Sequence, residues 1–249
     1  MKILAVIPAR YQSTRFPGKP LAMIKGKSMI NRVFEQVQEV KSIQKVVVAT
    51  DDQRIFDHVK QFNGEAILTG THHQNGTSRC HETLEILEAA GYSYDAVVNV
   101  QGDEPTIHPD QIEQVCSLLK NPTVEIATLI KKINNNETLF NPNVVKVVTA
   151  RNGKAIYFSR QPIPLVRDFE QNKWVNHHQY FKHIGIYGFR RSILNRIMQL
   201  TPGKLEQAER LEQLRWLENN LTIHTQTTDF ETIGIDTPED LENLLTIID

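Results

Sequence analysis

The sequence predicts an α/β protein built on a mixed, mainly parallel sheet flanked by helices. Three observations lead to this prediction: short and fully apolar runs, segments with helical apolar spacing, and the alternation of the two along the first half of the 249-residue chain. Fully apolar runs are typical of parallel strands, which are buried on both faces. In such sheets ligands bind beyond the carboxyl ends of the strands, and we expect a site at this edge.

The first half of the chain contains the clearest elements. The apolar run at residues 3–7 is the first strand, and Ser28 is placed to cap the first helix. Asp51 and Asp52 open the second helix, and a polar loop over residues 69–77 leads into the third. We expect strands at residues 3–7, 46–49, 66–68 and 96–100, and helices after Ser28, after Asp52, around Cys80 and from Pro109.

The second half is less regular. The dipeptide Asn152-Gly153 lies between two strand-like segments and predicts a hairpin. Because no segment has the composition of a linker, we expect a single domain over residues 1–249, with a smaller β-containing insertion in the second half. The expected strands are residues 125–130, 144–149, 155–159, 183–189, 222–226 and 232–235, and the expected helices are residues 192–200, 205–217 and one that opens at residues 237–240.

The composition excludes several classes of protein. Lys and Arg number 28 against 29 Asp and Glu, and the net charge of −1 argues against a strongly basic nucleic-acid-binding protein. The two cysteines, Cys80 and Cys116, occupy apolar helical positions, which argues against a disulfide scaffold or a cysteine zinc site. No segment approaches ~18 uninterrupted apolar residues, so we expect no membrane span. The simplest location is the cytoplasm.

Three cations follow the first strand within ten residues: Arg10, Arg15 and Lys19. Cations this close repel one another unless an anion lies among them, so the loop suits a polyphosphate. Backbone N–H groups near Gly18 could add to an anion-binding nest. The alternative is a solvated basic loop.

Two common nucleotide-binding motifs are absent. A Walker A loop needs a glycine five residues before the tripeptide Gly26-Lys27-Ser28, and that position is Leu21. The dinucleotide fingerprint GxGxxG would follow the first strand, yet no glycine precedes Gly18. The sequence therefore excludes P-loop NTPases and nicotinamide dehydrogenases.

Two acidic residues each end an apolar run. Asp103 follows the strand at residues 96–100, where a carboxylate can hold a hard cation such as Mg²⁺ or can cap a turn. Asp236 follows the run at residues 232–235 and is a candidate partner for Asp103. Its alternative role is the N-cap of the last helix, which has Pro238 near its start.

The histidines raise two questions: whether neighbouring pairs bind a metal ion, and what His183 contacts. The pairs His72-His73 and His177-His178 lie in expected loops, where neighbouring histidines rarely converge on one ion, and no HExxH pattern is present. We therefore expect no zinc site at either pair. His183 begins an apolar strand, where a polar side chain is costly unless it is hydrogen-bonded.

Taken together, these segments resemble the 3-deoxy-manno-octulosonate cytidylyltransferase (CMP-Kdo synthetase) family from end to end. The matching blocks are PARYQSTRFPGKPL (8–21), VVVATDD (46–52), HQNGTSR (73–79), NVQGDEP (99–105), FNPNVVKVV (140–148), AIYFSR (155–160), KHIGIYGFR (182–190), LEQLR (211–215) and GIDTPED (234–240). The resemblance implies a Rossmann-like nucleotidyltransferase fold, with residues 1–120 mainly nucleotide-binding and residues 121–230 mainly sugar-binding and dimerising. It also implies a homodimer that joins CTP and 3-deoxy-manno-octulosonate (Kdo) with Mg²⁺, giving CMP-Kdo and pyrophosphate for lipopolysaccharide biosynthesis.

The same resemblance implies a role for each matching residue. Arg10, Arg15 and Lys19 would hold the triphosphate, with Arg15 and Lys19 acting in catalysis, and Asp103 and Asp236 would hold Mg²⁺. The residues that would read the cytidine are Asn75, Gly76, Thr77 and Arg79, and those that would line the sugar-acid site are Gln101, Arg160, His183, Tyr187, Glu212 and Gln213. The chain departs from the family pattern at Gly70, His72, Asn75 and Ser78, where the family has a basic residue, an Asp, a Ser and an acid.

The mechanism that we expect is an in-line attack of the anomeric hydroxyl on the α-phosphorus of CTP. The basic loop would stabilise the negative charge that grows on pyrophosphate, and Arg160 could pair with the sugar carboxylate as a fork. Neither cysteine is placed as a nucleophile. Two other classes fit parts of the pattern: a glycosyltransferase, which would use an Asp and a metal without a triphosphate, and a nucleotide-sensing module without a product.

Overall fold

The computed structural model describes residues 1–248. Within the described residues the chain forms two compact units, one made of residues 1–116 and 231–248 and the other of residues 117–230. Each unit has its own core, and the strands and helices of each are described here separately.

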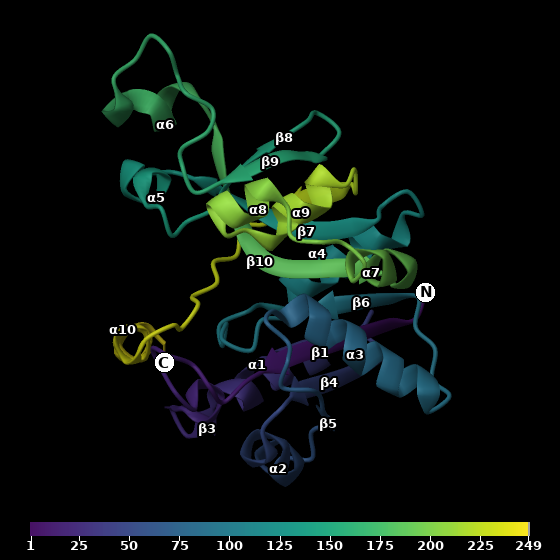
Figure 1. The fold of residues 1–249 in the computed structure, drawn as a ribbon. Helices are drawn as coiled ribbons and strands as arrows, with labels where there is room; N and C mark the ends of the chain where they lie inside the picture. Colours follow the sequence, from purple (N-terminus) through teal and green to yellow (C-terminus); the bar gives the residue numbers. More distant parts are fainter. Residues whose placement is uncertain (249) are drawn as a thin grey trace. The chain divides into compact units, whose positions relative to one another are not determined.

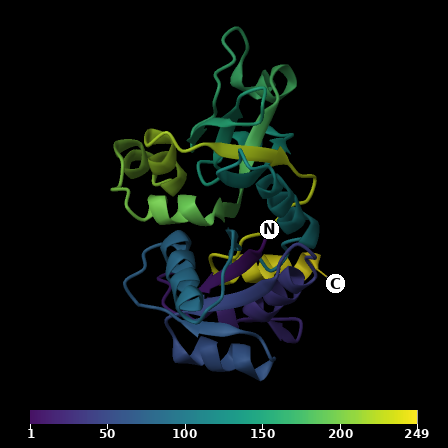
Figure 2. The same cartoon turned by 90° about the vertical axis from the view of Figure 1, so that its right-hand side faces the viewer.

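The first unit is a parallel sheet with helices on both faces. Its strands lie in the order β6-β1-β4-β5, and all neighbours are parallel. Helix α3 covers one face and α1 the other (Figures 1 and 2). The strands are β1 (Ile3–Ala9), β4 (Lys45–Thr50), β5 (Ala66–Leu68) and β6 (Ala96–Asn99), and a separate small hairpin joins β2 (Met23–Ile24) to β3 (Lys27–Ser28). The helices are η1 (Lys19–Leu21), α1 (Met29–Gln38), α2 (Gln53–Gln61), α3 (Gly76–Ala89) and α10 (Pro238–Ile247), and α4 (Pro109–Lys120) begins in this unit and ends in the other.

The strands of this unit form where the apolar runs predicted them. Residues 3–7 are fully buried, because the sheet has a helix on either face. The helix caps are also as expected: the side chain of Ser28 accepts a hydrogen bond from the backbone N–H of Asn31, and that of Asp52 from Arg54. The last helix joins this unit through a small core cluster, in which Leu244 and Ile235 pack with Ile24 and Met29.

The second unit has a mixed sheet. β11 pairs in parallel with β7, which pairs antiparallel with β10, and β8 and β9 extend the sheet as a hairpin. The predicted turn at Gly153 joins β8 and β9, and its φ of 80° is a conformation that glycine adopts without strain. The strands are β7 (Ile126–Ile133), β8 (Lys146–Thr149), β9 (Ala155–Ser159), β10 (Tyr180–Arg190) and β11 (Ile223–Thr227). The helices are α5 (Asn136–Phe140), η2 (Gln171–Lys173), α6 (Trp174–His177), α7 (Arg191–Ile197), α8 (Lys204–Glu209) and α9 (Glu212–Glu218).

Two predicted elements are wrong. The helix expected over residues 205–217 is two helices, because Arg210 between α8 and α9 adopts a left-handed conformation with φ 53°. The strand expected at residues 232–235 is an irregular segment. Its backbone donates single hydrogen bonds, from Ile233 to Thr106 Oγ1 at 3.0 Å and from Ile235 to the carbonyl of Asp103 at 2.9 Å, and does not join a strand ladder.

No helix within residues 1–248 is long and apolar enough to cross a membrane.

Candidate active site

The cationic loop after β1 is closed by its own backbone. Gly18 donates its N–H to the carbonyl of Tyr11 at 2.9 Å, with a φ of 73°. A Cβ at this position would lie 3.1 Å from the Tyr11 ring, so glycine allows both the turn and the close approach. The closed loop places Lys19 at its base and leaves Arg10 and Arg15 exposed.

The loop after β6 runs directly against the end of β1. A Cβ at Gly102 would lie 2.7 Å from the carbonyl oxygen of Pro8, so the approach requires glycine. Asp103 follows, and its carbonyl accepts the N–H of Ile235. This backbone contact brings the irregular segment of residues 232–235, and with it Asp236, next to Asp103.

The ammonium group of Lys19 joins the two acidic residues. Its Nζ donates to Asp103 Oδ2 at 2.7 Å, to the Ile235 carbonyl at 2.6 Å and to Asp236 Oδ1 at 3.3 Å. The Lys19 side chain is only 13% exposed. Arg15 contacts the other oxygen of Asp236 at 3.1 Å. Residues separated by more than 200 positions in the chain thus form one charged cluster.

Asp236 is not the cap of the last helix. The N-cap of α10 is Thr237, whose side chain accepts the N–H of Asp240, while Asp240 Oδ2 accepts the N–H groups of Asp236 and Thr237. The capping interpretation of Asp236 is therefore wrong. Because the helix is capped by its neighbour, the Asp236 carboxylate is left to the cluster with Lys19.

The donor set of this cluster fits a hard divalent cation. Two carboxylates and one backbone carbonyl already gather around a single cationic nitrogen, and oxygen donors are the ligands that Mg²⁺ prefers. The pair Asp103 and Asp236, proposed from two distant points of the sequence, meets at one place.

A pocket of about 840 Å³ opens beside the cluster. Its walls come from the cationic loop, the loop after β6 and the segment before α3. Asn75, Gly76 and Arg79 line it together with Gln101, whereas Thr77 is buried and lies outside the lining residues. The predicted residues of the first unit that line the pocket are Arg10, Arg15, Lys19, Asn75, Gly76, Arg79, Gln101, Asp103 and Asp236.

Two of these lining residues also have structural contacts. The side chain of Asn75 caps α3 by accepting the N–H of Ser78 at 2.9 Å. The buried guanidinium of Arg79 donates to Asp51 Oδ2 at 3.0 Å and to Thr69 Oγ1 at 2.5 Å. These contacts fix the pocket wall to which the family resemblance assigns base recognition.

Sequence reasoning missed Tyr11 and Arg54, which also line the pocket. The Arg54 guanidinium lies 3.3 Å from the centre of the Tyr11 ring, and it donates to both oxygens of Asp52. The side-chain hydrogen bond from Arg54 holds the pKa of Asp52 below its ordinary value, against the opposing effect of burial. The available signal is Tyr11, an aromatic residue inside the cationic loop.

In the second unit, His183 lies between aromatic rings. Its ring centre is 5.4 Å from that of Phe158 and 5.0 Å from that of Tyr187. A bulge in β10, where Ile184 faces Leu129 but Tyr187 faces Thr128, turns the Ile186 carbonyl toward the Thr128 hydroxyl. Thr128 Oγ1 donates to that carbonyl at 2.7 Å and lies 2.9 Å from His183 Nε2. This pattern assigns the proton to Nε2, and burial lowers the pKa of His183 to about 3.

Tyr187 and the start of α9 lie beside His183. The Tyr187 ring packs edge-on against Trp216 with centres 5.0 Å apart, and burial together with Glu212 raises the pKa of its hydroxyl. Among the described residues this buried hydroxyl has no hydrogen-bond partner. Gln213, next to Glu212, is buried. Unpartnered buried polar atoms are rare in proteins, and this one suggests that a ligand completes the cluster.

Arg160 is held by backbone carbonyls. Its Nε donates to the carbonyl of Glu209 at 2.8 Å and its Nη1 to that of Pro142 at 3.1 Å. Sequence reasoning missed Lys146, a fully buried lysine whose ammonium donates to the carbonyls of Asn141, Val144 and Arg160. Burial, followed by the nearby Arg160 charge, lowers the pKa of Lys146 to about 8.

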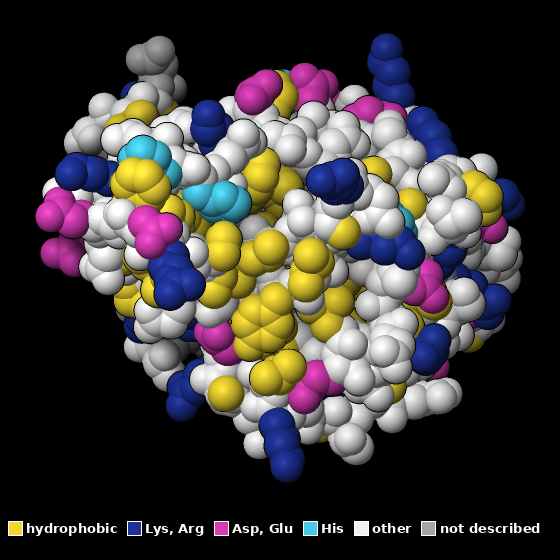
Figure 3. All heavy atoms as spheres, turned by 90° about the horizontal axis from the view of Figure 1, so that it is seen from above, with side chains coloured by type: hydrophobic (Ala, Val, Ile, Leu, Met, Phe, Trp, Pro, Cys, Tyr) yellow, Lys and Arg dark blue, Asp and Glu magenta, His cyan; other side chains and the backbone are white. Residues whose placement is uncertain are grey.

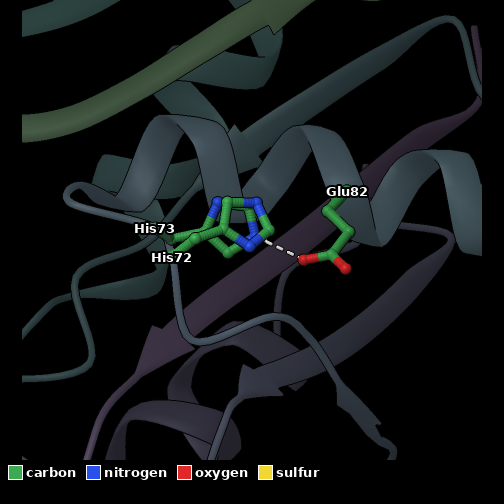
Figure 4. A group of neighbouring side chains, drawn as sticks. All are labelled: His72, His73 and Glu82. Atoms are coloured by element: carbon green, nitrogen blue, oxygen red, sulfur yellow. Dashed lines mark hydrogen bonds and ion pairs between the residues drawn. The ribbon is translucent and has the colours of Figure 1, made fainter.

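The histidine pair at residues 72 and 73 does converge, with Glu82. Ligand atoms of the three residues lie within 4.8 Å of one another, and Figure 4 shows the rings side by side and facing the carboxylate. Neighbouring histidines in a loop rarely converge, but here the His72 ring packs at a tilt against that of His73, with centres 4.2 Å apart.

Comparisons with known proteins identify the family. A sequence profile described as cytidylyltransferase matches residues 4–223. The 3-deoxy-manno-octulosonate cytidylyltransferase of Cytophaga hutchinsonii is 54% identical over 97% of this chain and 95% of its own length. This chain belongs to the 3-deoxy-manno-octulosonate cytidylyltransferase family. The relative of the same name from Parabacteroides distasonis is 48% identical over 100% of this chain and 98% of its own length.

A solved structure gives the same result for the fold. The structure of CMP:2-keto-3-deoxy-manno-octonic acid synthetase in complex with CTP superposes with a TM-score of 0.91 at 39% identity, covering 99% of this chain and 98% of the other. The predicted family, the Rossmann-like nucleotidyltransferase fold and the nucleotidyltransferase class are therefore confirmed.

Proposed function

We propose that this cytidylyltransferase joins CTP and Kdo to form CMP-Kdo and pyrophosphate. The observation that carries the proposal is the cluster of Lys19, Asp103 and Asp236 at the edge of a pocket lined by Arg10 and Arg15. Such an arrangement presents opposite charges to a triphosphate and to a cation that accompanies it. The relatives that are named for this activity align with this chain over nearly their whole lengths.

In the reaction, the anomeric hydroxyl oxygen of the sugar forms a bond to the α-phosphorus, and the bond from that phosphorus to the bridging oxygen breaks. Arg10 and Arg15 bind the triphosphate and stabilise the charge that develops on the departing pyrophosphate. Lys19 fixes Asp103 and Asp236 against each other, so that both carboxylates are oriented before substrates bind. No covalent intermediate with the protein is needed.

Asp103 and Asp236 are the residues that would hold Mg²⁺. An ion bound there would supply Lewis-acid stabilisation of the phosphoryl charge and would lower the pKa of the attacking hydroxyl. The cytidine would lie against Asn75, Gly76 and Arg79, where the contacts of Arg79 with Asp51 and Thr69 keep the wall in place.

The sugar acid would bind the predicted residues of the second unit. Two backbone carbonyls orient the Arg160 guanidinium, which can then pair with the sugar carboxylate. The Tyr187 hydroxyl can donate to a sugar oxygen, and Glu212 and Gln213 lie beside it at the start of α9. His183 stays neutral at physiological pH, so its Nδ1 is an acceptor for a sugar hydroxyl.

The proposal includes a homodimer and a role in lipopolysaccharide biosynthesis, as the family resemblance implies, and a cytoplasmic location. Hydrophobic side chains gather on the face of the molecule in Figure 3, and in the second unit Ile156, Leu165 and Phe169 are exposed. Exposed apolar side chains of this size favour contact between copies. Light scattering coupled to gel filtration would give the mass of the particle.

A substrate panel tests the reaction. The purified protein is incubated with Mg²⁺, with either CTP or UTP, and with Kdo or related sugar acids, and released pyrophosphate is measured together with the product mass. We expect pyrophosphate and CMP-Kdo in equal amounts, with CTP and Kdo preferred. A nucleotide sugar consumed without a triphosphate would instead indicate a glycosyltransferase, and nucleotide binding without any product would contradict the proposal.

A further inference from the structure

We propose that His72, His73 and Glu82 form a binding site for a transition-metal ion, with Zn²⁺ as the ion that fits best. Two imidazole nitrogens and one carboxylate oxygen lie within 4.8 Å of one another at the junction of the loop before α3 and the second turn of that helix (Figure 4). Two histidines and a glutamate, with water in the fourth position, are a known tetrahedral ligand set for zinc.

The partners that such ligands need around them are already present. His73 Nδ1 lies 3.0 Å from the hydroxyl of Ser78, while its Nε2 points to Glu82. The Glu82 carboxylate in turn accepts the N–H of Gly70, at 2.9 Å to one oxygen and 3.2 Å to the other. Metal-binding histidines and carboxylates are usually held by contacts of this kind, which set the ring orientation and the tautomer.

The third ligand is supplied by the exposed His72. Its ring stacks on that of His73 at an interplanar angle of 38°. A Cβ at Gly70 would lie 2.4 Å from His72 Nδ1, so the absence of a side chain at position 70 makes room for this ring. Because His72 is exposed and the His73 side chain is almost fully buried, the site has one accessible and one fixed imidazole.

The charge of the site suits a cation. Glu82 brings a carboxylate to the two imidazoles, and the N–H of Gly70 holds that carboxylate in place. A metal ion would take the place of the proton between His73 Nε2 and Glu82, which requires a small outward rotation of the flexible Glu82 side chain.

The site is chemically distinct from the cluster of Asp103 and Asp236. That cluster offers only oxygen donors, which suit Mg²⁺, whereas imidazole selects zinc and its neighbours. The two sites nevertheless share the pocket, because His73 lines it together with Thr71 and Gln74. A bound ion would cross-link this wall to α3.

Calorimetric titration with Zn²⁺, in excess Mg²⁺ so that oxygen-only sites are filled, tests the proposal. We expect one saturable Zn²⁺ site per chain, weakened at least ~10-fold in His72→Ala and in Glu82→Gln. The matched control is His81→Ala on the same helix, which removes a histidine that contacts Glu85 at 3.3 Å and lies outside the proposed ligand set, and this variant should bind Zn²⁺ like the wild type.

Absorption of Co²⁺ bound in place of Zn²⁺ gives a second readout. The bands of a tetrahedral cobalt centre should appear in the wild type and in His81→Ala, and should be lost in His72→Ala. Because the His72 side chain is exposed, its removal should leave the circular dichroism spectrum unchanged. The proposal is overturned if the wild type shows no saturable Zn²⁺ binding, or if His72→Ala binds Zn²⁺ as tightly as the wild type.

Discussion

In the first unit the candidate site residues are charged and partly exposed, whereas in the second they centre on aromatic and neutral side chains that are mostly buried. Arg15 and Asp236 are 62% and 52% exposed, and each is held by an opposite charge. Tyr187 and Gln213 are buried, and His183 is neutral. The difference follows from what each unit would bind. Charged side chains can bind a polyphosphate in a solvent-exposed pocket, whereas a sugar needs hydrogen bonds in fixed directions.

The largest expected effect concerns the charged cluster. Replacing Asp103 with Asn removes a metal-ligand candidate and one partner of Lys19. A divalent ion supplies several kcal/mol of transition-state stabilisation, so we expect kcat to fall at least ~10²-fold. Steady-state pyrophosphate release measures it. Asp110→Asn, which changes an exposed acid on α4, is the matched control. Retention of more than about a tenth of kcat in a folded Asp103→Asn protein would remove the metal assignment.

In the second unit, replacing a buried charged residue should lower the free energy of unfolding. Lys146→Met leaves the three carbonyl acceptors of Asn141, Val144 and Arg160 without their donor inside the protein. Unsatisfied buried acceptors cost about 1–3 kcal/mol each when fully desolvated, and partial relaxation should leave a loss of about 2–3 kcal/mol in the free energy of unfolding. Urea denaturation measures this loss. Lys132→Met, at an exposed position of β7, should change it by less than ~0.5 kcal/mol. Equal losses in the two variants would contradict the role of Lys146.

Acid should affect the two regions differently because of His183. In the unfolded chain its imidazole takes up a proton below a pKa of about 6.5, while in the folded protein burial lowers that pKa to about 3. The unfolded state therefore binds more protons between these values. The contribution of His183 to stability is complete above pH ~6.5 and is lost as the pH falls toward 3.

Urea midpoints at pH 7.5 and pH 5 measure this effect. The loss attributable to one such group is at most about 1.4 kcal/mol per pH unit. His183→Gln should show a shallower fall in stability on acidification than the wild type, and His108→Gln, at an exposed position, should match the wild type. Parallel falls in the wild type and His183→Gln would show that His183 is not the group responsible.

Much of the first unit was predictable because its signals are local. Apolar runs buried on both faces and side-chain caps such as Ser28 and Asp52 act within a few residues. The convergence of Asp103 and Asp236 followed from a topological rule for strand ends, even though the predicted strand before Asp236 does not form. That segment is placed by single hydrogen bonds to Thr106 and Asp103, and such contacts leave no periodic pattern.

The features that escaped prediction depend on distant partners. Arg210 adopts a left-handed conformation that is uncommon for residues other than glycine, so nothing in the sequence marks the break between α8 and α9. Lys146 lies in an apolar run and reads as a solvent-facing strand residue, yet its acceptors come from three separate positions. Convergence of His72 and His73 on Glu82 likewise depends on the space at Gly70. The sequence predicts where a polar group lies along an element more readily than what it contacts.

The smallest expected effect is that of replacing Arg15. Because this side chain is charged but exposed, its replacement tests the role of charge without removing a buried group. Its contact with Asp236 at 3.1 Å joins two exposed side chains, and such a pair contributes at most about 1 kcal/mol to stability. Arg15→Ala should therefore unfold at nearly the wild-type urea concentration. Loss of one exposed phosphate contact should raise the KM for CTP about 3–10-fold with a smaller change in kcat, since a single charge-assisted hydrogen bond contributes about 1 kcal/mol in a screened setting.

Salt sharpens this comparison. Because exposed charges are screened over about a Debye length, the KM of the wild type should rise with added KCl and approach that of Arg15→Ala. The control is Lys25→Ala, which removes an exposed cation that donates to the carbonyl of Ile248 and lies outside the pocket lining, and it should keep the wild-type salt response. If Arg15→Ala has wild-type kinetics at every salt concentration, Arg15 lies outside the triphosphate site, and the charge of the pocket comes from Arg10 and Lys19 alone among the cations of its loop.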